Sequence, residues 1–181
     1  MNKPSLKTTF SLFTMLLLLL MSILPAGCGQ TKPPASQTPA PGAEQTMQLT
    51  LYFPKSDASG LAAVERLVTV QNQDVLKVLF TELTKPPAGM ENPLPAGTVL
   101  LKTDISKEGL ATLDLSAEFS NNFNGGSAAE EMTLYSIVNT VTALPDIKSV
   151  QFLMEGQKSA SLLGSVDTAT PFTRKGDLIV N

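Results

Sequence analysis

Cys28 is the only cysteine in the 181-residue chain, and the chain contains no histidine. The lack of histidine excludes Ser-His-Asp and Cys-His catalytic arrangements and histidine-based zinc sites. Two carboxylate pairs, Asp114 with Glu118 and Glu130 with Glu131, have the chemistry of an acid and a base. The first pair follows a predicted strand, and the second begins a predicted helix, where negative charge suits the dipole. We therefore expect structural roles for all four carboxylates, no catalytic residue, no metal and no cofactor.

The surroundings of Cys28 are typical of a secretory signal. Lys3 and Lys7 precede an apolar stretch at residues 10–24, and small residues lead to the cysteine. The run Ala26-Gly27-Cys28 resembles the end of a bacterial lipoprotein signal, in which cleavage after Gly27 leaves an acylated Cys28 as the new N-terminus. Residues 1–27 are therefore predicted to be a lipoprotein signal peptide, and Cys28 the lipid attachment site.

Two other interpretations of this end remain open. The apolar stretch has 15 residues, fewer than the roughly 20 that cross a bilayer, although it could still be an uncleaved anchor. Ordinary cleavage without lipidation is the second, because Pro25 stands where lipoprotein signals usually have leucine. The diacylglyceryl group of a bacterial lipoprotein would meet the need for more than one acyl chain in stable anchoring.

Composition predicts a tether followed by a single domain. Residues 28–46 are rich in Pro, Ala, Thr and Gln, which favours an extended, disordered tether. Residues 47–181 are enough for one domain. Removing residues 1–27 takes away two lysines and no acid, so the net charge changes from −3 to −5. Such a surface disfavours nucleic acid as a partner.

Hydrophobic periodicity in residues 47–181 predicts an α+β fold. The expected order is helix, strand, strand, helix, strand after two N-terminal strands, with the helices on one face of a mainly antiparallel sheet. One predicted strand places Val99, Leu101 and Ile105 on one face. Strands are predicted at 47–53, 64–70, 98–105, 110–115, 150–154 and 178–180, and helices at 75–83 and 127–144.

The second helix has a predicted start motif at Gly125, Gly126, Ser127 and Glu130. Ser127 and Glu130 have the spacing of a capping box, in which each side chain bonds the backbone N–H of the other. The glycines are expected to adopt positive φ in a tight turn. A phosphate-binding loop is the alternative, but no Gly-x-Gly-x-x-Gly or P-loop lysine is present, and Glu130 would repel an anion.

Six segments together resemble the GerMN domain of sporulation and spore-germination lipoproteins. The resemblance implies an α/β sandwich fold like the ring-building motif, no catalytic residues, no cofactor, and docking onto envelope assemblies. Family members often have two such domains in tandem, whereas this chain has room for one. The segments are residues 51–54 (LYFP), 94–98 (LPAGT), 113–119 (LDLSAEF), 124–130 (NGGSAAE), 134–140 (LYSIVNT) and 150–156 (VQFLMEG).

Two functions follow as expectations. The first is a non-enzymatic, membrane-tethered module at the extracytoplasmic face of the bacterial membrane. It would contact the lipid bilayer through Cys28 and other envelope proteins through its domain, with an assembly or scaffolding role connected to sporulation or germination. The alternative is a sensor lipoprotein that binds a small ligand or the cell wall.

Overall fold

The computed structural model describes residues 45–70 and 74–180. The predicted signal peptide, Gly27 and Cys28 lie outside these residues, as does nearly all of the predicted tether. The first strand, β1, already begins at Gln45, inside the range predicted for the tether. Among the described residues, no helix combines the length and the apolar character needed to cross a membrane.

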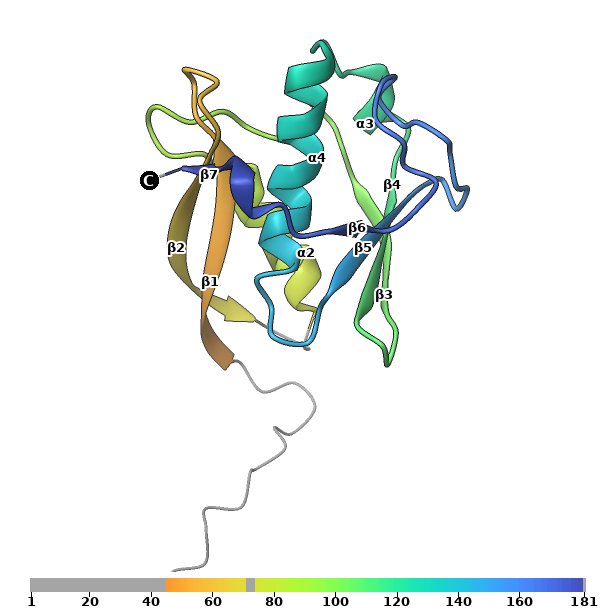
Figure 1. Cartoon of the computed structure of the whole chain (residues 1–181). Coiled ribbons are helices and arrows are strands. Elements are labelled where there is room, and N and C mark those ends of the chain that lie inside the picture. The colour runs from red at the N-terminus through yellow and green to blue at the C-terminus, as the bar shows by residue number, and fades with distance from the viewer. Residues whose placement is uncertain (1–44, 71–73, 181) are drawn as a thin grey trace, which may run out of the picture. The chain divides into compact units, whose positions relative to one another are not determined.

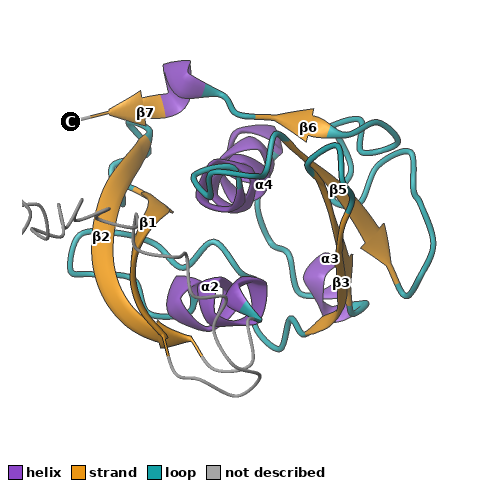
Figure 2. Cartoon of the chain, turned by 90° about the horizontal axis from the view of Figure 1, so that it is seen from below, coloured by secondary structure: helices purple, strands orange, loops and turns teal. Residues whose placement is uncertain are grey.

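Two separate sheets enclose the main helices (Figures 1 and 2). The helices α2 and α4 lie between the sheets, and the short α3 follows β4. The first sheet has the order β1 (Gln45–Pro54), β2 (Leu61–Val70), β7 (Ile179–Val180). The second has the order β3 (Leu100–Ile105), β4 (Leu110–Leu115), β5 (Ser149–Met154), β6 (Phe172–Thr173). The helices are α2 (Val75–Leu83), α3 (Glu118–Asn121), α4 (Ser127–Val141) and the 3-10 turn η1 (Gly176–Leu178).

The predicted α+β class and the order α2-β3-β4-α4-β5 are confirmed. The expectation of a single sheet was wrong, because β1 pairs only with β2, and β2 pairs otherwise only with β7. Pairing is mainly antiparallel, with β4–β5 and β2–β7 as the parallel pairs of the described strands. Helix α4 connects the parallel strands β4 and β5, as expected of a crossover between parallel neighbours.

Alternating residues of both sheets point toward the helices and form one core. In β1, Leu49, Leu51 and Phe53 are at most 1% exposed, as the period-two pattern predicted. The facing strands contribute equally buried side chains. Because each sheet supplies one apolar face, the helices are covered from both sides. The fully buried residues of the second sheet are Ala111, Leu113, Leu115, Val150 and Phe152.

Helix α4 is buried around most of its circumference in its second half. Every residue from Ser136 to Val141 is buried, including Asn139 and Thr140. The apolar residues Leu134, Ile137, Val138 and Val141 therefore account for only part of the buried surface of the helix. A helix buried from all sides is expected where two layers enclose it.

The start of α2 and the β3–β4 turn follow from local sequence. The Asp74 side chain accepts the Lys77 backbone N–H at 3.3 Å, which caps α2 directly before the predicted helix start at residue 75. Gly109 has φ +90°, and a Cβ there would lie 2.7 Å from the Asp146 carbonyl oxygen. The turn thus requires glycine both for its backbone conformation and for close approach of the segment before β5.

Candidate functional site

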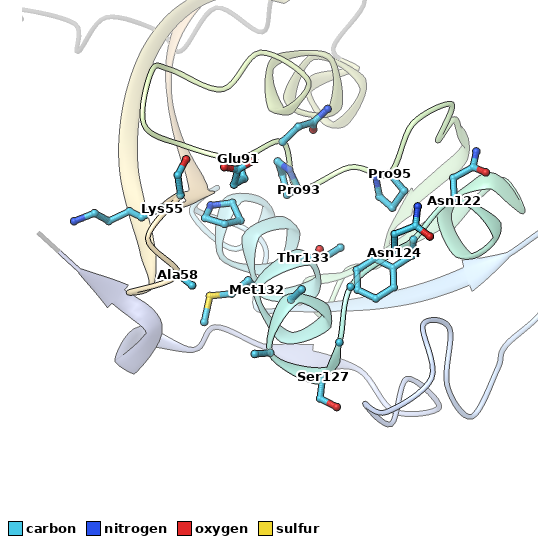
Figure 3. A pocket seen from close by; sticks show the side chains of 18 residues that line it. Lys55, Ala58, Glu91, Pro93, Pro95, Asn122, Asn124, Ser127, Met132 and Thr133 are labelled. Atoms are coloured by element: carbon cyan, nitrogen blue, oxygen red, sulfur yellow. The ribbon is translucent and has the colours of Figure 1, made fainter.

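A groove of about 900 Å³ opens beside the first turns of α4 (Figure 3). Three segments distant in sequence form it together with α4. They are the start of the β1–β2 turn at 54–58, the proline-rich loop at 91–95, and the connection from α3 to α4 at 122–126. Three of the segments that resemble the GerMN domain contribute residues to it, namely 51–54, 94–98 and 124–130.

The groove combines apolar walls with a mixed polar rim. Met132 and Thr133 of α4 lie across from Glu91 and Pro93 of the proline-rich loop (Figure 3). Pro93 is buried and Met132 is half-buried, so apolar surface continues from the core into the groove. The rim carries one base, one acid and three side-chain amides: Lys55, Glu91, Asn92, Asn122 and Asn124.

Two of the rim amides shape the loops that carry them. The Asn122 side chain donates to the Ala96 carbonyl oxygen at 2.7 Å, which joins the end of α3 to the proline-rich loop. The Asn92 side chain accepts the Leu94 N–H at 2.9 Å and forms a local turn. The amide of Asn124 is exposed and forms no hydrogen bond with any described residue, so it is available to a ligand.

The predicted capping box is not formed. Gly126 is the N-cap, with φ −90° and ψ −174°, and it has no side chain to offer. The first helical bond runs from the Glu130 N–H to the Gly126 carbonyl oxygen at 2.9 Å, so Ser127 is already inside the helix. From this position the Ser127 hydroxyl cannot cap and instead bonds the Ser165 hydroxyl at 3.0 Å.

The two glycines at this start do not adopt the expected positive φ. Gly126 has negative φ, and Gly125 is not among the glycines with positive φ. A Cβ on Gly125 would lie 2.5 Å from the Cβ of Ala129 and 2.6 Å from the Phe123 ring. Gly125 is therefore required for space, because the chain passes closely over the first turn of α4.

Glu130 is a buried carboxylate with a different role from the predicted one. Its side chain reaches the loop after β5, where its two oxygens accept the backbone N–H groups of Ser165 and Val166 at 2.8 and 2.9 Å. The residue is only 1% exposed, and the first turn of α4 adds a favourable dipole. Glu130 therefore joins this loop to the helix that lines the groove.

A second polar cluster includes Glu131, Tyr135 and Asn139 of α4 and is bonded within the domain. The Asn139 amide pairs with the backbone of Lys175 at 3.0 and 2.9 Å. The Lys175 ammonium bonds Glu131 and lies 5.1 Å from the Tyr135 ring centre. Arg174 bonds the Asn139 carbonyl oxygen and the Tyr52 hydroxyl. This cluster fixes the segment before η1 to α4 and is structural.

The carboxylates considered for catalysis have separate structural partners. Asp114 accepts the Gly156 N–H at 2.8 Å. Glu118 begins α3, and a hydrogen bond from the Ser116 hydroxyl lowers its pKa. The salt bridge with Glu131 raises the pKa of Lys175. Within residues 45–70 and 74–180, no three acidic, cysteine or histidine side chains gather where they could hold a metal ion.

The sequence analysis singled out Gly125, Gly126 and Ser127, which line the groove, but only as a helix-start motif. The groove itself and its other lining residues were not predicted from the sequence. Prolines and asparagines in loops carry no periodicity, and their meeting point depends on the packing of α4. The only signal that could have found them was the coincidence of the LYFP, LPAGT and NGGSAAE segments within one domain. That coincidence predicted a fold but gave no reason to place these segments side by side.

The two-sheet α+β arrangement defines the fold class, because solved GerMN domains share it. The tandem GerMN domains of the sporulation protein GerM from Bacillus subtilis align with a TM-score of 0.61 and 21% identity, over 74% of this chain and 48% of theirs. The first GerMN domain of the same protein aligns with a TM-score of 0.56 and 21% identity, over 73% of this chain and 99% of that domain. This chain thus spans about half of the tandem structure.

The chain belongs to the Germane family, described as sporulation and spore germination, whose model matches residues 50–160. A crystal structure of a candidate lipoprotein from Clostridium perfringens aligns with a TM-score of 0.50 and 26% identity, over 80% of this chain and 99% of that one. No curated protein matches this chain significantly. The predicted family is therefore confirmed.

The Glu130→Gln variant should lose about 1.5–3 kcal/mol of unfolding free energy. The amide keeps one acceptor but turns an NH₂ group toward a backbone N–H, leaving one of the two loop donors unpaired. Hydrogen exchange at Ser165 and Val166 should accelerate together. Chemical denaturation and exchange by mass spectrometry measure both effects.

The neighbouring Glu131→Gln variant is the matched control. Glu131 pairs with Lys175, and both side chains are about one-third exposed, at 35% and 32%. Such a pair contributes at most about 1 kcal/mol. Equal losses in the two variants, or unchanged exchange at Ser165 in Glu130→Gln, would contradict the role assigned to Glu130.

Proposed function

We propose that this chain is a lipid-anchored extracytoplasmic protein whose GerMN domain binds an extended segment of another envelope protein and catalyses no reaction. The groove beside α4 is the observation that carries the proposal, since it joins apolar walls to a polar rim at an exposed end of the domain. Family membership supports a context in sporulation or germination. The Clostridium perfringens relative, a candidate lipoprotein, supports the anchored location.

The chemistry of the groove favours a peptide over a strongly charged ligand. Lys55 and Glu91 carry opposite charges on the rim, so the rim gives no concentrated field for phosphate or for a polyacid. The Asn124 amide can both donate to and accept from a peptide backbone. Pro93 and Met132 supply the apolar contacts that side chains of an extended segment require.

The groove also supports a second candidate, a ligand-binding or wall-binding lipoprotein. Its volume of about 900 Å³ lies within the range of small-molecule sites, roughly 300–1,000 Å³. Side-chain amides and a carboxylate beside apolar surface are groups that could also bind sugar hydroxyls and short wall peptides. The two candidates differ in the size of the occupant.

Replacing Cys28 with Ala should release the protein from membranes, because the thiol is the proposed site of acylation. The measurement is membrane fractionation with metabolic labelling by a fatty acid. Ser36→Ala, in the same predicted tether, serves as the control and should stay labelled and sedimenting. A Cys28→Ala protein that remains in the membrane pellet with unchanged electrophoretic mobility would refute the anchor.

Introducing a charge at Ala128 should block the groove without disturbing the core. Ala128 is exposed, lines the groove, and lies in the first turn of α4, where glutamate is favourable. With a photoreactive amino acid at position 124, cells should yield a cross-linked product of defined mass. The Ala128→Glu change should reduce that product at least about tenfold, equivalent to 1.4 kcal/mol of binding free energy.

The matched control for this experiment is Ala63→Glu, at an exposed alanine of β2 outside the groove. It should leave the cross-linked product unchanged. A product equally intense in both variants, or no product from position 124 while the protein is folded and membrane-bound, would show that the groove does not bind a protein segment.

The second candidate predicts that muropeptides stabilise the domain thermally. Binding to the native state alone raises its stability by an amount that grows with ligand concentration. A shift seen with muropeptides and abolished by Ala128→Glu would favour the ligand-binding function. No shift at millimolar concentration would rule these fragments out as the groove's ligand.

A further inference from the structure

Strand β3 has an unusually apolar free edge. It is the terminal strand of the second sheet and pairs only with β4 among the described strands. Four large apolar side chains of the described residues are strongly exposed, and three belong to β3 or directly precede it. Val99, Leu101 and Ile105 are 54%, 49% and 46% exposed. Proteins usually protect such edges, because unpaired backbone beside apolar side chains invites another strand.

The hydrogen-bond ladder with β4 shows which backbone groups of β3 are free. The Ser106 N–H donates to the Leu110 carbonyl oxygen at 2.9 Å, and the same register places Asp104 opposite Thr112 and Lys102 opposite Asp114. In an antiparallel pair, hydrogen-bonded positions alternate along the strand. Asp104 and Lys102 therefore bond toward β4. The N–H and C=O groups of Thr103 and Ile105 point away from the sheet.

We propose that β3 pairs antiparallel with β3 of a second copy of this chain, in a register centred on Thr103. In this register Thr103 faces Thr103 of the second copy as a hydrogen-bonded pair, which uses the free backbone groups. Lys102 then lies opposite Asp104 of the second copy, and Asp104 opposite Lys102. The next pair places Leu101, the extra residue of the bulge between Leu100 and Lys102, against Ile105 of the second copy.

The sequence of β3 also disfavours the neighbouring registers. Only shifts of two residues keep the free backbone groups paired, because side chains and hydrogen-bonding positions both have period two. One such shift places Lys102 opposite Lys102 of the second copy, and the other places Asp104 opposite Asp104. Like charges directly opposite each other are destabilising. The charge pattern thus selects the centred register, and it favours a second copy over a strand of unrelated sequence.

The inference goes beyond the proposed function, because β3 contributes no residue to the groove. The pairing requires neither a lipid nor a groove ligand. The test therefore examines membrane-bound and soluble fractions alike, so that failure of the anchor and failure of the pairing remain distinguishable.

The test is disulfide cross-linking of the full chain carrying Thr103→Cys. A hydrogen-bonded antiparallel pair has Cα atoms about 5.5 Å apart, which suits a disulfide. Mild oxidation should give a product of twice the chain mass on non-reducing gels. The parent chain, with Cys28 alone, gives the background. Leu67→Cys, at a residue of β2 that is 74% exposed, controls for random collision.

Charge variants then test the register. Adding Asp104→Lys should reduce the Thr103→Cys cross-link at least about fivefold, because two lysine pairs then face each other. A further Lys102→Glu should restore it. This glutamate also lies opposite Asp114 of its own chain, so thermal unfolding confirms that both variants remain folded.

Three results would overturn the pairing. The first is a Thr103→Cys product no stronger than that of the parent or of Leu67→Cys. The second is a product containing a different protein, which would identify a foreign strand as the occupant. The third is a cross-link unaffected by Asp104→Lys, or not restored by Lys102→Glu in a folded chain.

Discussion

The fold depends on α4, which packs against both sheets and also forms hydrogen bonds with the backbone of β1. Its side toward the second sheet is apolar, whereas its side toward β1 carries hydroxyls. The Thr140 hydroxyl accepts the Tyr52 N–H at 2.9 Å, and the Ser136 hydroxyl donates to the Tyr52 carbonyl oxygen. These two residues are one helical turn apart, so they meet one strand residue together. Helix α4 thereby provides hydrogen-bond partners for the N–H and C=O groups of Tyr52. These groups face the edge of β1 that has no neighbouring strand.

This anchoring determines where the candidate site lies. Because the second half of α4 is held by both sheets, its first turns extend to one end of the sandwich, where Ser127, Ala128 and Ala129 are exposed (Figure 1). The loops at that end pack beside the helix, and their polar residues Glu91, Asn92 and Asn124 stay exposed. Glu130 holds the loop after β5 directly. No cationic side chain among the described residues pairs with its carboxylate, whose charge is stabilised by two backbone N–H groups and the helix dipole.

The sequence predicted the elements far better than their assembly. Alternation of Leu49, Leu51 and Phe53 identified β1, and apolar residues spaced three and four apart identified α2 at 75–83, because both signals are local. No local signal says which strand pairs with which, so the separation into two sheets was missed. Strand β7 lies within the strand predicted at 178–180. Strand β6 was not predicted, because its two residues are too few for a periodic pattern.

The prediction of a capping box at the start of α4 failed for a related reason. Ser127 and Glu130 have capping-box spacing, and sequence alone cannot show that the loop after β5 offers Glu130 two better donors. Once Glu130 turns to Ser165 and Val166, the reciprocal cap loses half of its bonds. The N-cap then lies one residue earlier, at Gly126, and Ser127 becomes the first residue of the helix. Tertiary contacts therefore overrode a local motif at the point where the groove forms.

The groove and the free edge of β3 lie at different places on the domain, which lets them act together. The groove lies where α4 begins, while the β3–β4 turn lies at the opposite end of the sandwich (Figure 1). They share no residue, so pairing through β3 would leave both grooves of a dimer open. Two grooves held on one assembly raise the effective concentration of each for a partner that carries two binding segments. A weak groove could then act in a stable envelope assembly, because avidity requires no new contact within either site.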